Sequence, residues 1–210
     1  SKLGSKSKAK TDIIVRLIAR ANQNVEAFLE IDKSGSNGLS GRGNGSFDIE
    51  VRPSRGIFNL KGDYTLTSGT FLYNAFGLAK REFDIQDGSN VKFNGAIMDS
   101  DLDINAIYRT KAPLSRLISD TTSVNSRRTV ECGIAITDKL SNPSLAFSID
   151  IPDLEPSIKS QVENALSTED KVQKQFIALL LSNNFLPDEQ SGVTNNPSSI
   201  LYSNVAEIMA

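Results

Sequence analysis

Three aspartates at alternate positions are the first candidates for metal chemistry. Asp99, Asp101 and Asp103 resemble the start of a calcium-binding loop, in which alternate oxygen ligands converge on one ion. They alternate with Leu102 and Ile104, however, and the glycine and the distant glutamate of such a loop are absent. The spacing therefore favours the solvated face of a β-strand over a metal site.

Two further features could carry chemistry, and each has a simpler interpretation. Gly41, Gly43 and Gly45 have neither the GxGxxG spacing nor the following helix of a phosphate-binding loop, so they indicate a flexible hairpin connection. Cys132 lies within an alternating apolar run, and no histidine exists in the chain to activate it. We expect this thiol to act as a small buried hydrophobe.

The composition argues against most enzyme classes and against nucleic-acid binding. The chain has no histidine and one cysteine, which removes imidazole bases, histidine-ligated metals and multi-thiolate zinc sites. Its net charge is −2 and its pI is about 5.3, whereas a general nucleic-acid binder needs a clustered basic excess. We expect no cofactor and no catalytic residues. A carbohydrate hydrolase with an Asp/Glu pair is the enzymatic alternative.

The elements that position these residues follow from periodicity. From Ile13 to Ile151 apolar and polar residues alternate, which predicts strands with one apolar face. Turn sequences separate the runs, among them Gly43-Asn44-Gly45, Thr67-Ser68-Gly69, Asp87-Gly88-Ser89 and Ser141-Asn142-Pro143. Short strands at this spacing, without helices between most of them, predict an antiparallel meander.

The period becomes helical after Pro152. The apolar spacing and Pro156 predict one helix from about 156 to 166. Ser167 or Thr168 can cap a second helix that ends near Asn183. A short helical turn is expected at 113–118, followed by a Ser/Thr-rich loop. We therefore divide the chain into a β-rich domain (1–152), a helical segment (153–187) and a polar linker and tail (188–210).

About ten one-sided strands allow two architectures. Their apolar faces can pack on each other in a β-sandwich or closed barrel. Alternatively, one folded-over sheet can leave a continuous apolar groove open to a lipid. Alternation alone does not separate these possibilities.

An ordered series of short motifs is similar to the C-terminal region of the TamB family. The motifs have the form GxY, FxIxxGS, AxY and NPxxxFxIxxP, and together they span about residues 45–187. The runs that carry the resemblance are Leu60–Phe71, Phe83–Gly95, Leu102–Ala112, Arg128–Cys132, Asn142–Pro152 and Gln175–Pro187. The sequence departs from the pattern at Phe93-Asn94-Gly95, where relatives often have Trp followed by Gly-Asp-Pro.

The resemblance implies the periplasmic end of a large Gram-negative envelope protein, anchored in the inner membrane by an N-terminal helix. It implies a mainly β fold, an antiparallel sheet bent into an open groove (a β-taco) with an apolar interior, plus two short C-terminal helices. Two roles are associated with such proteins. One is the transport of phospholipid between the membranes; the other is outer-membrane protein assembly with a barrel of the TamA type. No catalytic residues come with the family.

In a groove of this kind, the apolar faces of the strands could shelter a lipid acyl chain from water. Sheltering a methylene from water is worth about 0.8 kcal/mol, so a 16-carbon chain crossing water unprotected costs about 12 kcal/mol. Free sheet edges can also pair with a partner strand. The expected partner-docking residues are Phe176, Leu180 and Phe185. The expected groove lining is Phe58, Leu60, Tyr64, Leu66, Phe71, Tyr73, Phe83, Ile85, Phe93, Ile104, Tyr108, Ile134, Phe147 and Ile149.

Overall fold

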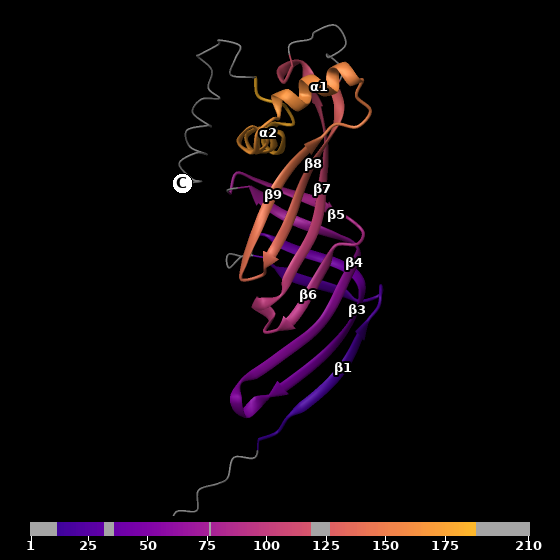
Figure 1. The fold of residues 1–210 in the computed structure, drawn as a ribbon, viewed down its shortest axis with the longest axis vertical. Coiled ribbons are helices and arrows are strands. Elements are labelled where there is room, and N and C mark those ends of the chain that lie inside the picture. The colour runs from indigo at the N-terminus through magenta and orange to yellow at the C-terminus, as the bar shows by residue number, and fades with distance from the viewer. Residues whose placement is uncertain (1–11, 32–35, 76, 119–126, 188–210) are drawn as a thin grey trace, which may run out of the picture.

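The structure, a computed structural model, describes residues 12–31, 36–75, 77–118 and 127–187 (Figure 1). Most of this part is one antiparallel sheet, and two helices follow it. The strands are β1 (Val15–Ala21), β2 (Glu26–Glu30), β3 (Gly38–Arg52), β4 (Ile57–Ala75), β5 (Ala79–Ile85), β6 (Asn90–Gly95), β7 (Asp101–Pro113), β8 (Arg127–Lys139) and β9 (Asn142–Asp150). The helices are α1 (Pro156–Ala165) and α2 (Glu169–Ser182).

The sheet is open rather than closed into a barrel. Its order is β1-β3-β4-β5-β7-β8-β9, with β2 beside β3 and β6 between β4 and β7. Within the described residues β1 and β2 pair only with β3, and β9 pairs only with β8. The predicted fold class, an open antiparallel sheet followed by two short helices, is therefore confirmed.

The sheet changes its strand neighbours halfway along β4, a strand of 19 residues. Thr70–Ala75 pair with β5, whereas Leu60–Thr65 pair with β6. The predicted turn at Asp87-Gly88-Ser89 joins β5 to β6, and the Leu66 N–H donates to the carbonyl of Ser89 at 2.7 Å. Two short strands therefore form one broken row between β4 and β7.

Two turns predicted from glycine-rich sequence are wrong. Gly41, Gly43 and Gly45 lie inside β3, and Thr67-Ser68-Gly69 lies inside β4. These segments pair with each other, and their register shifts between Arg42 and Gly43. A Cβ on Gly43 would lie 2.0 Å from the Thr65 carbonyl oxygen, so the irregular strands approach too closely for a side chain. Glycine is required here because the backbones of β3 and β4 lie close together, and not because the chain turns.

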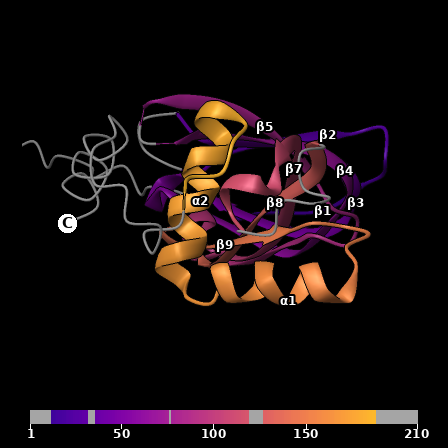
Figure 2. The same ribbon diagram turned by 90° about the horizontal axis from the view of Figure 1, so that it is seen from above.

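Both predicted helices are present and cover one end of the sheet (Figures 1 and 2). Pro156 opens α1, and the Thr168 side chain accepts a hydrogen bond from the Lys171 N–H at the start of α2. Asn183 ends α2 in the left-handed conformation. The predicted turn after Pro113 is a 3₁₀ helix at 114–116, while the predicted loop at 119–126 and the linker and tail at 188–210 lie outside the described residues.

Candidate functional site: the apolar inner face

The strand register places all fourteen predicted lining residues on one face of the sheet, called here the inner face. Phe71 is paired with Phe83, and Ile134 with both Ala106 and Phe147, so each apolar side chain lies beside others across the strands. Cys132 also faces inward, and burial raises the pKa of its thiol to about 12. This agrees with its interpretation as a small hydrophobe.

Helix α2 covers the inner face at one end of the sheet, called here the closed end. Phe176 of α2 lies with its ring centroid 4.6 Å from that of Phe147 and 6.0 Å from that of Phe83. The Phe83 ring in turn contacts Tyr73 at 6.1 Å and Tyr108 at 5.6 Å. Phe83 and Phe176 are fully buried, so this end is filled by the protein's own aromatic side chains.

The three residues predicted to dock a partner belong to this packing. Phe176, Leu180 and Phe185 are all fully buried. Gln175 holds the segment after α2 against the helix, because its side chain donates to the Leu186 carbonyl at 3.0 Å and accepts from the Leu186 N–H at 2.8 Å. Docking through these side chains stays a prediction, and it requires α2 to leave the sheet.

A polar cluster fastens the end of α2 to β7. The Asn183 side-chain oxygen accepts from the Thr110 hydroxyl at 2.8 Å and from the Tyr108 hydroxyl at 3.4 Å. Arg127 donates to the Asn183 carbonyl at 3.0 Å. These bonds fix the helix C-terminus over the aromatic cluster.

At the other end of the sheet, called here the open arm, no helix covers the inner face among the described residues. The open arm consists of β1, the part of β3 from 45 to 52 and the part of β4 from 57 to 65. Leu17 is 54% exposed and Phe58 46% exposed, while Ile49 and Leu60 are half-buried. A row of aliphatic and aromatic side chains therefore faces solvent.

Sequence reasoning missed the contribution of β1 and β3 to this surface. Leu17 pairs with Ile49, which pairs with Leu60, so the three form one continuous apolar row. The signal in β1 was weak because Leu17 and Ile18 are adjacent apolar residues on opposite faces. In β3 the alternation of Ile49 with its polar neighbours was visible. Alternation does not show, however, whether another element covers that face of the strand.

A smaller aromatic group lies where the open arm meets the rest of the sheet. The ring of Phe47 is 6.2 Å from that of Tyr64 and 5.8 Å, edge-on, from that of Phe93. The Tyr64 hydroxyl donates to the Val25 carbonyl at 3.1 Å, and burial raises the Tyr64 pKa. This group continues the apolar inner face from the closed end into the open arm.

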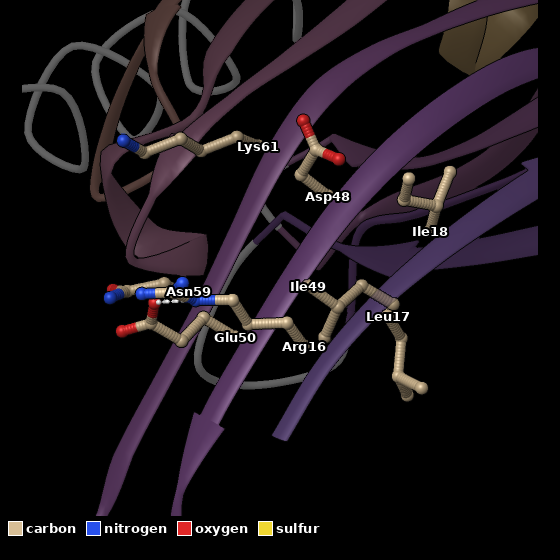
Figure 3. A pocket seen from close by; sticks show the side chains of 8 residues that line it. All are labelled: Arg16, Leu17, Ile18, Asp48, Ile49, Glu50, Asn59 and Lys61. Carbon is tan, nitrogen blue, oxygen red and sulfur yellow. Dashed lines mark hydrogen bonds and ion pairs between the residues drawn. The ribbon is translucent and has the colours of Figure 1, made fainter. Parts of the chain in front are cut away.

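A depression of about 480 Å³ lies on the opposite, outer face of the open arm (Figure 3). Its rim carries Asp48 and Lys61, and Glu50 accepts hydrogen bonds from Arg16 at 3.0 Å and Arg52 at 2.8 Å. These two arginines lower the pKa of Glu50, so the cluster is a stable set of ion pairs. Leu17, Ile18 and Ile49 complete its lining, so the depression is partly apolar and differs from the inner face by its charged groups.

A second cavity, of about 400 Å³, lies between β9 and the N-terminal end of α2. It is lined by Leu145, Ala146, Phe147, Leu166, Ser167, Thr168, Glu169, Val172 and Gln173. Leu145 and Phe147 are inner-face residues of β9, paired with Ile136 and Ile134 of β8. The cavity therefore opens beside the inner face at the closed end.

Asp101, the middle residue of the three aspartates considered for metal binding, pairs with neighbouring side chains. Asp101 forms an ion pair with Lys139 and accepts a hydrogen bond from Asn94 at 2.6 Å, and these contacts lower the Asp101 pKa. In the described ranges no three acidic, cysteine or histidine side chains gather as a metal site would require.

The match to known proteins agrees with this arrangement. The model of the TamB C-terminal domain family matches residues 1–208, which is nearly the whole chain. The chain belongs to the TamB family. TamB proteins are cell-envelope proteins of the translocation and assembly module and function in outer-membrane biogenesis. No curated protein and no solved structure matches significantly.

The helices of this TamB domain are short. Neither α1 nor α2 has the length and hydropathy that a membrane-crossing helix needs, as judged over the described residues.

Proposed function

We propose that this TamB domain shelters phospholipid acyl chains on the inner face of its sheet as they pass between the inner and outer membranes. The observation that carries the proposal is the open arm, where Leu17 and Phe58 stay about half exposed beside the half-buried Ile49 and Leu60. Soluble proteins rarely expose contiguous apolar surface, and where they do it commonly marks a binding site. A lipid tail provides the matching apolar cover.

The size of the effect fits a transport role. About 12 kcal/mol opposes moving a 16-carbon chain through water, and contact along an apolar face removes a large part of that barrier. An acyl chain on this face could contact several strands, because the row from Leu17 through Ile49 to Leu60 crosses three of them. We place the domain in the periplasm, as part of a protein anchored in the inner membrane.

The test is native mass spectrometry with lipid extraction on protein purified gently from a Gram-negative host. We expect phospholipid to co-purify with the wild type and to be lost from Phe58→Asp, because a carboxylate on the inner face opposes an acyl chain. The matched control is Asn59→Asp, which adds the same charge to the next residue, on the other face of β4. Folded protein that never carries lipid would overturn the proposal.

Phe83 and Phe147 are unsuitable for this test. Phe83 is fully buried, and the Phe147 ring packs against Phe176, so a carboxylate at either position would unfold the closed end and confuse lipid loss with misfolding. Position 58 avoids this because its side chain is already partly in water.

A second function, assembly of outer-membrane proteins with a TamA-type barrel, is supported by the edge formed by β1 and β2. In the described chain these strands pair only with β3, and they expose Ile18 (76%) and Phe28 (69%) on the outer face. A partner strand added to this edge would pair its backbone and cover these side chains.

A photo-crosslinker at Ile18 tests this role in cells. Crosslinks to the periplasmic part of a TamA-type barrel are expected from position 18. A crosslinker at Ser144, an exposed residue on β9 at the opposite edge of the sheet, is the control. Equal or absent crosslinking from both positions would remove the strand-edge proposal.

A further inference from the structure

The aromatic centre of the closed end is packed, but part of its inner face is left uncovered at the edge strand β9. Leu145 of β9 and Ile136 of β8 are directly paired and point to the same face. Ile136 is fully buried, whereas Leu145 is 41% exposed. An inner-face leucine at the covered end of the sheet is therefore left in contact with open space.

The start of α2 explains this gap. The helix begins at Glu169, and its first deep contact with the sheet is made about two turns later, where Phe176 meets Phe147 at 4.6 Å. Leu166 and Val172, which precede this contact in the chain, are half-buried and border the cavity of about 400 Å³. The cavity is consequently bounded by β9 on one side and by the first turns of α2 on the other.

The lining separates into an apolar part and a polar part. The apolar part consists of five residues: Leu145, Ala146, Phe147, Leu166 and Val172. The polar lining comes from a single place, the segment before α2 and its first two turns, as Ser167, Thr168, Glu169 and Gln173. A ligand that fits this arrangement has an apolar chain and one polar end, which is the chemistry of an acyl lipid.

We propose that the cavity between β9 and α2 binds a single acyl chain of a phospholipid, with its polar end near the start of α2. The inference rests on the proposed function of the inner face and adds a side-access site to it. The cavity continues the inner face through Leu145 and Phe147, so a chain held here lies beside the lipid-carrying surface. The Phe147–Phe176 contact closes the inner end of the site.

The cavity volume limits the occupant to one chain. A methylene takes about the volume of a water molecule in the liquid, roughly 30 Å³, so 400 Å³ admits roughly a dozen methylenes. Two chains of a diacyl lipid would not both fit. The second chain would remain outside the cavity, where the inner face or the membrane can cover it.

The probe is an 18-carbon polyene fatty acid whose fluorescence increases in an apolar site, titrated into the whole protein. Leu145→Trp fills the cavity, and we expect it to weaken binding of the fatty acid at least tenfold. The control is Ser144→Trp, which places the same side chain on the neighbouring exposed residue of β9 that points away from the inner face. Equal affinity of the two variants would overturn the proposal.

A second variant keeps the test decisive if tryptophan disturbs β9. Leu145→Ser removes apolar lining without adding volume, and we expect about fivefold weaker binding of the fatty acid with an unchanged far-ultraviolet spectrum. Wild-type affinity in this variant would count against the site. A folded wild type that does not bind the fatty acid at all would also overturn it.

Phospholipid competition separates the two ligand sources and the two proposals. Displacement of the fatty acid from the wild type by monomeric lysophosphatidylethanolamine, which adds no bilayer that could absorb the probe, supports a phospholipid tail as occupant; failure of displacement assigns the site to free fatty acid and overturns the phospholipid assignment. Phe58→Asp serves as the reference for the open arm. If Phe58→Asp lacks co-purified phospholipid but binds the fatty acid normally, the cavity and the open arm are separate sites. If Leu145→Trp binds the fatty acid normally while Phe58→Asp loses phospholipid, only the cavity proposal fails.

Discussion

The closed end and the open arm carry similar side chains on the same face of one sheet, but they bury them differently. Phe83 at the closed end is fully buried beneath Phe176, whereas Phe58 in the open arm is about half exposed. Both are phenylalanines that alternate with polar residues in their strands. The difference arises because α2 folds back over β5 and β9, while no described element covers β1, β3 and β4 at the other end.

The comparison indicates a division of work within the domain. The closed end provides the packed core that a domain of this size needs, with aromatic rings contacting each other across four strands and one helix. The inner face of the open arm stays exposed and available for a ligand. The strands of the open arm are joined by backbone pairing, and its outer face carries ion pairs such as Arg16–Glu50.

The same substitution at both ends should give the largest contrast. We expect Phe83→Ala to lower the free energy of unfolding by about 3–5 kcal/mol, because it removes a fully buried ring from the aromatic cluster. Phe58→Ala should lower it by less than about 1 kcal/mol, since that ring is partly in water. Urea unfolding of the two variants measures both values. Similar losses would mean that the open arm is as tightly packed as the closed end.

Glycine at the register shift between β3 and β4 should affect stability nearly as much. Gly43→Ala should destabilise the fold by about 1–3 kcal/mol, because the new Cβ would lie 2.0 Å from the Thr65 carbonyl oxygen. Gly38→Ala, in the same strand with its nearest neighbour at 3.4 Å, should leave the stability unchanged or raise it by up to about 1 kcal/mol. Thermal unfolding of this pair tests the close approach of β3 and β4, and an unaffected Gly43→Ala would disprove it.

The attachment of α2 to β7 can be loosened without disturbing the aromatic cluster. Asn183→Gly should cost about 1 kcal/mol, because it removes the hydrogen bonds from Tyr108 and Thr110 but keeps the left-handed conformation accessible. Asn183→Ala should cost about 1 kcal/mol more, since alanine disfavours that conformation. Faster amide hydrogen exchange in α2 than in β8 should accompany both changes. Equal stability of wild type and both variants would show that these bonds do not hold the helix.

The smallest effect is a pH dependence confined to the open arm. Arg16 and Arg52 lower the pKa of Glu50 in the folded protein below its ordinary value of 4.5. The folded state therefore binds fewer protons here than the unfolded state, so the stabilisation is complete above pH 4.5 and is lost as the pH falls through the lowered pKa. The difference in urea midpoint between wild type and Glu50→Gln should shrink over that range.

The control for this pH dependence is Glu82→Gln. Glu82 is an exposed residue of β5 for which the described structure shows no ion pair. The urea midpoints of this variant and of Glu50→Gln are compared at each pH. A Glu50→Gln difference that persists at low pH would contradict the role of the two arginines.

Prediction from sequence succeeded where the signal is local. Two-residue alternation identified the strands and their inner face, including Phe71, Phe83 and Phe147. Pro156 and a cap at Ser167 or Thr168 identified the helices, and the structure shows that the cap is Thr168. It failed at Gly43 and Gly69, because a glycine in a tight turn and one beneath a neighbouring backbone look alike in sequence. It also missed Leu17, whose row becomes visible only when β1 is paired with β3.

By itself, the sequence determined which side chains share a face, because side-chain direction alternates along any strand. It also determined the two helices and the family through the order of its motifs. Only the tertiary structure decided which part of that face is covered. That depends on where α2 lies after the chain turns back at residues 151–155, and it places Phe176 against Phe147 while leaving Leu17, Phe58 and Leu145 partly exposed. Burial is a property of contacts between distant segments, so the local pattern could not supply it.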